Sequence, residues 1–152
     1  MNIRKRFGKQ EVLKGISFTF EPARVNMIIG PSGCGKSVLI KCIVGLIEPD
    51  AGEVYYGGVD FRRATSEQKR EILKNLGMLF QSSALFDSMT VGENVAFPMR
   101  IFTQSSEKEI RERVAYCLER VGLPGVEEKY PAQLSGGMKR RVGLARAIVL
   151  NP

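Results

Sequence analysis

The stretch GPSGCGKS, residues 30–37, decides the fold of this chain. It matches the full spacing G-x-x-x-x-G-K-[ST], and it stands between two apolar runs, VNMIIG (25–30) and VLIKCIVGL (38–46). The first run is typical of a strand buried on both faces in a parallel sheet, and the second of a short buried helix that ends at Gly45. The sequence therefore predicts a phosphate-binding loop between a strand and a helix, in an α/β fold.

The residues of this loop suit a phosphate ligand. Its glycines let the backbone curl tightly, so that consecutive N–H groups point inward, where the dipole of the following helix adds positive potential. Lys36 is expected to reach the β and γ phosphates, and the Ser37 hydroxyl is expected to ligate a bridging Mg²⁺. The alternative is a glycine-rich turn with an exposed lysine, which the flanking strand and helix argue against. The predicted nucleotide-binding residues are Gly30, Pro31, Ser32, Gly33, Cys34 (a small tolerated side chain rather than a nucleophile), Gly35, Lys36, Ser37 and Val38.

Composition and charge narrow the class of protein. The chain has 152 residues, about one domain by length, with 43% hydrophobic residues and neither a membrane-spanning run nor a signal core, so a cytosolic location is expected. It contains no His, and its 3 cysteines lack metal-binding spacing, which excludes a zinc site or a His-based triad and predicts reduced thiols. The net charge of +7 suits nucleic acid, acidic lipid, phosphate ligands or a missing acidic part of the chain, and decides nothing alone.

Periodicity and capping residues predict the remaining elements. Strands are expected at ISFTFE (16–21), EVYYGG (53–58) and GMLFQ (77–81). Three helices are expected. The first spans 65–76 and has Thr65 and Gln68 as a capping box, and the second begins after Ser106, which forms a capping box with Glu109. The third spans 136–150. The segment 82–100 is irregular, with more apolar residues than a free loop should expose.

The last of these helices opens on LSGGMKRR, residues 134–141, two glycines and a serine ahead of a basic run. The Ser135 hydroxyl and the free N–H groups of Gly136 and Gly137 form a second potential anion-binding site at the positive end of the helix dipole. Taken alone, an ordinary helix N-cap is the simpler interpretation.

The order GPSGCGKS, then Gln81 at the end of GMLFQ, then LSGGM (134–138) resembles the nucleotide-binding subunits of ATP-binding cassette (ABC) transporters. The resemblance covers essentially the whole chain. It implies a P-loop NTPase (RecA-like) core with a β subdomain and an inserted helical subdomain, with ATP and Mg²⁺ as cofactors and ATP hydrolysis coupled to transport. It also implies that two subunits, in a homodimer, pack head to tail, so that Ser135, Gly136 and Gly137 of one subunit face the γ-phosphate held by the other.

Other roles are implied by the same resemblance. Phe7 matches an aromatic that stacks on adenine, and Gln81 matches a glutamine that reaches Mg²⁺ and the attacking water. Segment 82–100 matches the region that docks transmembrane permease subunits. The sequence FQSSALFDSMTVGENVAFPMR, with LSGGM in place of LSGGQ, is most similar to ATPases of the Mce-associated, lipid-asymmetry type. A phospholipid-transport ATPase on the inner face of the bacterial cell membrane is therefore expected.

The chain departs from the family pattern after Pro152, where the Mg²⁺-binding aspartate, the catalytic glutamate and the switch histidine are not found. A truncated cassette is expected, marginally stable and unable to turn over ATP, with a β-rich and P-loop part at 1–81, a helical subdomain at about 82–135 and the signature helix at 136–150. The missing acidic residues would lower the net charge and weaken any nucleic-acid interpretation. The alternatives are a soluble ABC ATPase acting on ribosomes or DNA, or another P-loop enzyme such as a GTPase, whose NKxD pattern is absent.

Overall fold

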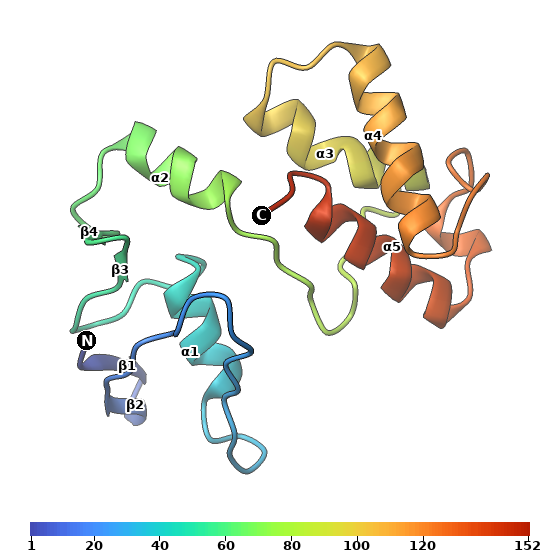
Figure 1. The fold of residues 1–152 in the computed structure, drawn as a ribbon. Coiled ribbons are helices and arrows are strands. Elements are labelled where there is room, and N and C mark those ends of the chain that lie inside the picture. Colours follow the sequence, from blue (N-terminus) through green and yellow to red (C-terminus); the bar gives the residue numbers. More distant parts are fainter. The chain divides into compact units, whose positions relative to one another are not determined.

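The computed structural model describes residues 1–152 as two compact units, Met1–Lys69 and Arg70–Pro152 (Figure 1). The first unit holds two hairpins and one helix, and the second holds the remaining helices, while α2 runs across the boundary. In chain order the elements are β1 (Ile3–Phe7), β2 (Gln10–Ile16), α1 (Lys36–Ile43), β3 (Tyr55–Tyr56), β4 (Val59–Asp60), α2 (Ser66–Lys74), α3 (Val91–Phe102), α4 (Glu107–Arg120), the 3₁₀ turn η1 (Pro131–Gln133) and α5 (Gly136–Ile148).

The first unit is organised around the antiparallel β1–β2 hairpin, in which Phe7 pairs with Gln10 across the turn and Ile3 pairs with Ile16. Helix α1 packs on this hairpin, and the two elements share a small core of Ile3, Leu13, Leu39 and Cys42. Burial raises the pKa of the Cys42 thiol. The core holds the start of α1 against β2, which fixes the end of the phosphate loop.

Four predicted strands are absent or only partly present in the structure. Strand β2 ends at Ile16, so 17–21 is not a strand, and the segments 25–30 and 77–81 are also outside any strand. Val25 and Ile29 are 93% and 83% exposed rather than buried. An apolar run becomes a strand only when a neighbouring segment pairs with its backbone groups, and no segment of residues 1–152 pairs with these. The predicted strand at 53–58 is confirmed only in part, as the β3–β4 hairpin.

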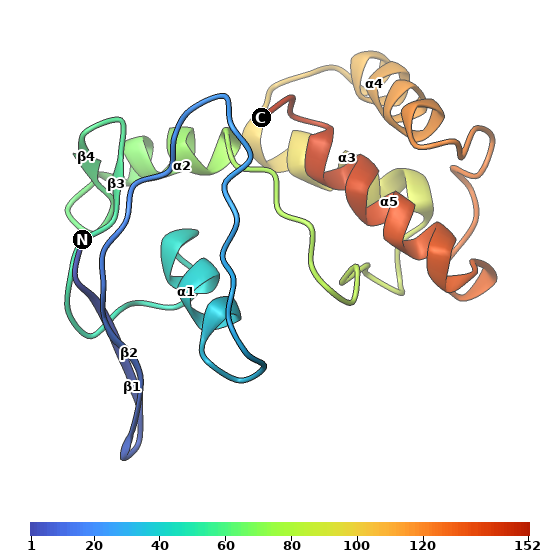
Figure 2. The same ribbon diagram turned by 60° about the horizontal axis from the view of Figure 1, so that its bottom comes forward.

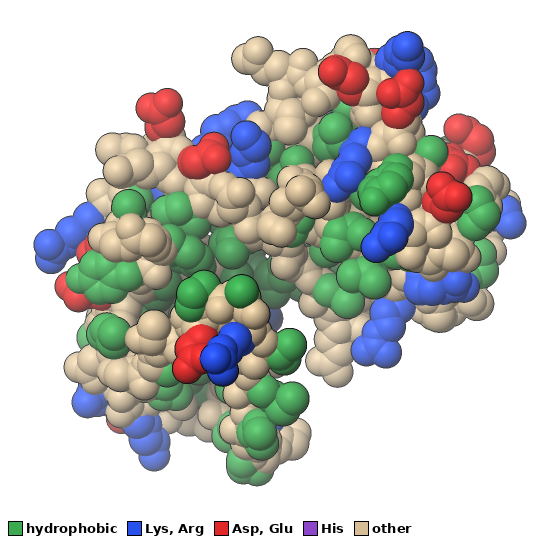
Figure 3. All heavy atoms as spheres, viewed as in Figure 1, with side chains coloured by type: hydrophobic (Ala, Val, Ile, Leu, Met, Phe, Trp, Pro, Cys, Tyr) green, Lys and Arg blue, Asp and Glu red, His purple; other side chains and the backbone are tan.

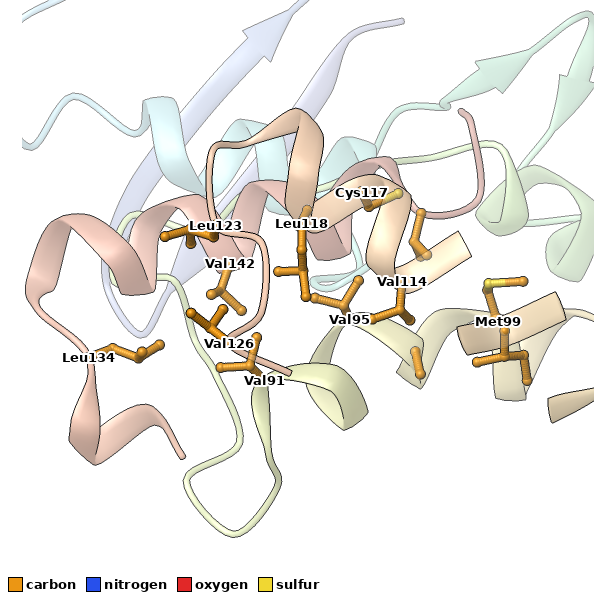
Figure 4. Close-up of a cluster of buried hydrophobic side chains, with 14 residues drawn as sticks. Val91, Val95, Met99, Val114, Cys117, Leu118, Leu123, Val126, Leu134 and Val142 are labelled. Carbon is orange, nitrogen blue, oxygen red and sulfur yellow. The ribbon is translucent and has the colours of Figure 1, made fainter. Parts of the chain in front are cut away.

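The second unit is a three-helix arrangement in which α3, α4 and α5 each contact the other two. Its core consists of apolar side chains from all three helices and from the 121–134 connection, several of them fully enclosed (Figure 4). Leu118 and Cys117 of α4 and Val142 of α5 are completely buried, and burial raises the pKa of the Cys117 thiol. The predicted helices at 65–76, after Ser106 and at 136–150 are confirmed, with both predicted capping boxes formed.

The segment 82–100, predicted to be irregular, includes most of helix α3 (Val91–Phe102). Thr90 caps it, with the Thr90 hydroxyl accepting from the Glu93 N–H and the Glu93 carboxylate accepting from the Thr90 N–H. The sequence prediction failed because Gly92 and Pro98 suggest a break, yet Pro98 lies within the helix. Packing of Val91, Val95 and Met99 against α4 and α5 outweighs these weak local preferences.

On the face of the molecule shown in Figure 3, Lys and Arg side chains are interspersed with Asp and Glu rather than gathered in one basic patch. None of the helices combines the length and the apolar character that crossing a bilayer requires.

Candidate functional site

The phosphate loop is the turn through which the chain enters α1 (Figure 2). The Cys34 N–H donates to the Pro31 carbonyl at 3.4 Å, and Gly33 and Gly35 adopt φ of 78° and 98°. These left-handed angles favour glycine because a Cβ is strained there. At Gly30 an added Cβ would lie 2.8 Å from Cys34 Sγ, so a larger residue there would require the Cys34 side chain to move. The predicted tight curl is present.

The beginning of α1 offers unpaired backbone donors to a ligand. The first N–H groups of an α-helix have no partner within it, and here the Leu39 N–H is the first to donate, to the Gly35 carbonyl at 2.8 Å. Gly35 supplies no capping side chain, and the first turn contains no acidic residue. The N–H groups of Lys36, Ser37 and Val38 are therefore at the positive end of the helix dipole with no competing carboxylate.

Lys36 folds back over the loop that precedes it. Its ammonium group donates to the carbonyls of Gly30 and Pro31, both at 2.7 Å, and lies 3.9 Å from Cys34 Sγ. The same loop therefore combines backbone donors, a helix N-terminus and a positive charge. This donor set fits the phosphates of a nucleotide.

Magnesium is the cation that accompanies such phosphates. The residues of the loop could bind it only together with the phosphates of the nucleotide. No group of three or more His, Cys, Asp or Glu side chains is arranged to hold a metal ion. Mg²⁺ is typically bound by one or two protein oxygens together with substrate phosphates and water. Ser37, exposed on the first turn of α1, would supply one protein oxygen, and the phosphates would supply others.

Phe7 ends strand β1 at the tip of the first hairpin. Its ring is 48% exposed, and the Lys5 ammonium lies 5.6 Å from the ring centroid. An exposed aromatic face is available for stacking, so the predicted adenine contact stays a prediction.

Helix α5 begins with a serine N-cap. The Ser135 hydroxyl accepts from the Met138 N–H at 3.2 Å, and the N–H groups of Gly136 and Gly137, as the first two of the helix, have no intrahelical partner. A Cβ added at either glycine would meet nothing within 4 Å. The fold of this chain therefore does not require glycine at 136 or 137.

Gln81 is exposed in a turn closed by the Ser83 N–H, which donates to the Phe80 carbonyl at 3.0 Å. It belongs to the second unit with Ser135, whereas Phe7, Lys36 and Ser37 belong to the first. Sequence reasoning missed two residues that shape the Gln81 region, Asn94 and Arg146. The helical spacing of Val91, Asn94 and Val95 could have indicated that Asn94 lies on the buried face of a helix. No local sequence pattern indicates the role of Arg146.

The glycine-rich loop that leads into α1, together with Lys36 and the motif GPSGCGKS, defines the class as a P-loop nucleotide-binding protein. The chain belongs to the ABC transporter family, whose sequence profile matches residues 13–152. Its fold is therefore the α/β P-loop NTPase fold that the motif predicts.

Relatives and solved structures agree with this assignment. The chain is 41% identical over 151 residues to the intermembrane phospholipid transport system ATP-binding protein MlaF of Haemophilus influenzae, covering 99% of this chain and 57% of that protein. It is 43% identical over 148 residues to a probable ribonucleotide transport ATP-binding protein, mkl, of Mycobacterium tuberculosis, covering 97% of this chain and 41% of that protein. The chain thus spans about half the length of these relatives or less.

The solved dimeric structure of the ATP-binding cassette MJ0796, in a post-hydrolysis state bound to ADP and phosphate, superimposes with a TM-score of 0.88 at 31% identity. The match covers 99% of this chain and 68% of that one. The predicted membership of the family and the predicted fold class are confirmed. The alternative of an ABC ATPase acting on ribosomes or DNA has no support in these comparisons.

Proposed function

We propose that this chain is the ATP-binding part of an ABC transporter, in which ATP binding and hydrolysis at a dimer interface drive the movement of a substrate through membrane-embedded partners. The phosphate loop binds the triphosphate through the N–H groups at the start of α1, and Lys36 supplies positive charge at the β and γ phosphates. Bound Mg²⁺ would neutralise developing charge on the transferred phosphoryl group, with Ser37 and Gln81 as its protein-side contacts. Phe7 stacks on the adenine ring.

The observation that carries the dimer proposal is the pair of glycines at the start of α5. Gly136 and Gly137 are exposed, their added Cβ atoms would meet nothing within 4 Å, and helix positions are otherwise weakened by glycine. Two glycines that the fold does not need suggest close approach of something outside the chain. We propose that this is the γ-phosphate held by a second copy, with Ser135 beside it, as in a head-to-tail dimer.

Replacing Gly137 by alanine tests this proposal because it separates folding from assembly. The melting temperature should stay unchanged or rise, since alanine favours the helix by up to about 1 kcal/mol. Dimer formation of the full-length protein with a non-hydrolysable ATP analogue, followed by analytical ultracentrifugation, should weaken by about tenfold or more, since the added methyl group would keep the γ-phosphate away from the Gly137 N–H and at least one charge-assisted hydrogen bond would be lost.

Nucleotide affinity of the Gly137→Ala monomer serves as the internal control, because the monomer's own phosphate loop is intact. It should equal that of the unsubstituted monomer. Dimerisation at the same analogue concentration as the unsubstituted protein would contradict a contact at Gly137.

The permease docks, in this proposal, on an apolar groove of the second unit. The groove has a volume of about 390 Å³ and combines aromatic and aliphatic side chains from α2, the 77–86 segment, α3 and α5, among them Leu73, Phe80, Phe86, Phe97 and Ile101. Such concave apolar surfaces suit a helix laid in a groove. The predicted boundaries at about 81 and 135 remain part of the proposal.

Phospholipid is the substrate that we propose. The resemblance of the 80–100 segment to lipid-asymmetry ATPases and the name of the Haemophilus influenzae relative support it, while the name of the mycobacterial relative refers to ribonucleotides. A position on the inner face of the bacterial membrane follows from the same proposal. Stimulation of ATPase activity of the assembled transporter by phospholipid, and not by ribonucleotides other than ATP, is the expected result.

Residues 1–152 alone are proposed to hold ATP without turning it over. Neither a histidine nor an apolar strand followed by Asp-Glu occurs among them, so no general base for the attacking water is identified. A purified polypeptide of residues 1–152 should show nucleotide binding by fluorescence titration and no sustained phosphate release. Repeated turnover, abolished by Lys36→Ala, would contradict this.

A further inference from the structure

The backbone that follows Gln81 is held in an unusual conformation by one side chain. Ser83 and Ala84 have φ of 63° and 46°, in the left-handed region that non-glycine residues rarely adopt. The Arg146 guanidinium donates to both carbonyls, from Nη2 to Ser83 at 2.6 Å and from Nη1 to Ala84 at 2.8 Å. The planar fork of arginine suits two adjacent acceptors, whereas a lysine ammonium is a single point of charge.

The same helix also packs tightly against the turn that presents Gln81. A Cβ added at Gly143, three residues before Arg146, would lie 3.1 Å from Leu79 Cδ1 and 3.4 Å from Ser83 Cβ. Gly143 and Ser83 are both buried. Helix α5 therefore contacts the chain on both sides of Gln81, before the turn at Leu79 and after it at Ser83.

Asn94 of α3 fixes the next part of the same segment. Its side-chain carbonyl accepts from the Phe86 N–H at 2.8 Å, and its amide group donates to the Phe86 carbonyl at 3.0 Å. Burial lowers the pKa of the Arg146 guanidinium, which reflects its partly enclosed position. The turn is thus held by Arg146 and the following residues by Asn94, while Gln81 itself stays exposed.

We propose that Arg146 is a positioning residue for Gln81, because it holds the turn that carries Gln81 in one backbone conformation. It does so from α5, whose N-terminal Gly136 lies ten residues earlier, roughly 15 Å along a rigid helix. The second potential anion-binding site, at the N-terminus of α5, and the turn that carries Gln81 therefore belong to the same compact unit. This inference rests on the proposed function, since Gln81 acts on Mg²⁺ and nucleotide only if the site binds them.

Amide hydrogen exchange of the nucleotide-free, full-length protein tests the positioning role. Arg146→Met should raise exchange of the Ser83 amide by about tenfold or more, because charge-assisted bonds that hold its turn are lost. Arg146→Lys should recover part of the protection. The Phe86 amide, held by Asn94, should change much less.

Arg141 provides the matched control on the same helix. Its guanidinium also donates to two backbone carbonyls, those of Val121 and Gly122, at 3.2 and 2.9 Å. Arg141→Met should leave exchange at Ser83 unchanged even where it lowers the melting temperature. Equal exchange at Ser83 in the Arg146→Lys, Arg146→Met and unsubstituted proteins would overturn the proposal.

A double-mutant cycle with Gln81→Ala tests whether Arg146 acts through Gln81. Affinity for Mg²⁺ and a non-hydrolysable ATP analogue should fall by about tenfold on Gln81→Ala, and Arg146→Met should add little in that background. An equal further loss in that background would mean a general structural role and would overturn the proposal. Lys36→Ala distinguishes failure of the proposed function from failure of the positioning role. Undiminished analogue binding by that variant contradicts the proposed function, whereas amide exchange at Ser83 depends on Arg146 alone.

Discussion

Lys36→Ala is expected to lower the affinity of the protein for ATP by about tenfold to a hundredfold or more. The ammonium group lies over the loop, 2.7 Å from each of two loop carbonyls, and can exchange one of these contacts for a phosphate oxygen. Each charge-assisted hydrogen bond contributes roughly 1.5 to 3 kcal/mol, and the backbone donors of Ser37 and Val38 would remain. Titration with a fluorescent ATP analogue measures the loss.

Lys41→Ala is the matched control for this experiment, since Lys41 is a lysine near the other end of the same helix. Its removal should leave nucleotide affinity nearly unchanged. If Lys36→Ala and Lys41→Ala bind the analogue equally well, the phosphate loop is not the nucleotide site.

Replacing Asn94 by leucine is expected to destabilise the protein by about 3 kcal/mol or more. Asn94 is 0% exposed, and its side chain forms hydrogen bonds with both backbone groups of Phe86 and with the carbonyls of Met89 and Thr90. Leucine has a similar volume but no polar atoms, so the Phe86 N–H and carbonyl would be left without these partners, at about 1 to 3 kcal/mol each. Urea unfolding followed by circular dichroism measures the change.

Asn75→Leu provides the comparison for Asn94. Asn75 is exposed, and its side chain bonds only to Glu71, one turn earlier. The stability change there should stay within about 0.5 kcal/mol. Similar losses for the two variants would show that the hydrogen bonds of Asn94 do not stabilise the segment that follows Gln81.

The helices were predictable where their signals are local. The boxes formed by Thr65 with Gln68 and by Ser106 with Glu109 are present because each depends on residues three apart. The same signal, Thr90 with Glu93, precedes α3, but Gly92 and Pro98 within that helix concealed it. Tertiary packing against α4 and α5 decided the outcome.

The strands were predicted less well because their stability depends on a second segment. The run 25–30 has the composition of a buried strand, yet Val25 and Ile29 are largely exposed and unpaired. Composition identifies which residues favour a strand, but hydrogen bonding to a neighbouring strand decides whether it forms.

The sequence by itself determined the family, the phosphate loop with Lys36 and Ser37, and the opening of α5 at Ser135, because each is a contiguous motif whose spacing encodes its backbone geometry. Only the tertiary structure decided that Arg146 holds the turn of Gln81. That contact joins residues more than 60 positions apart. Its acceptors are backbone carbonyls, which every residue possesses, so no pattern of residue types marks them and only the packing of α5 against the turn brings them together.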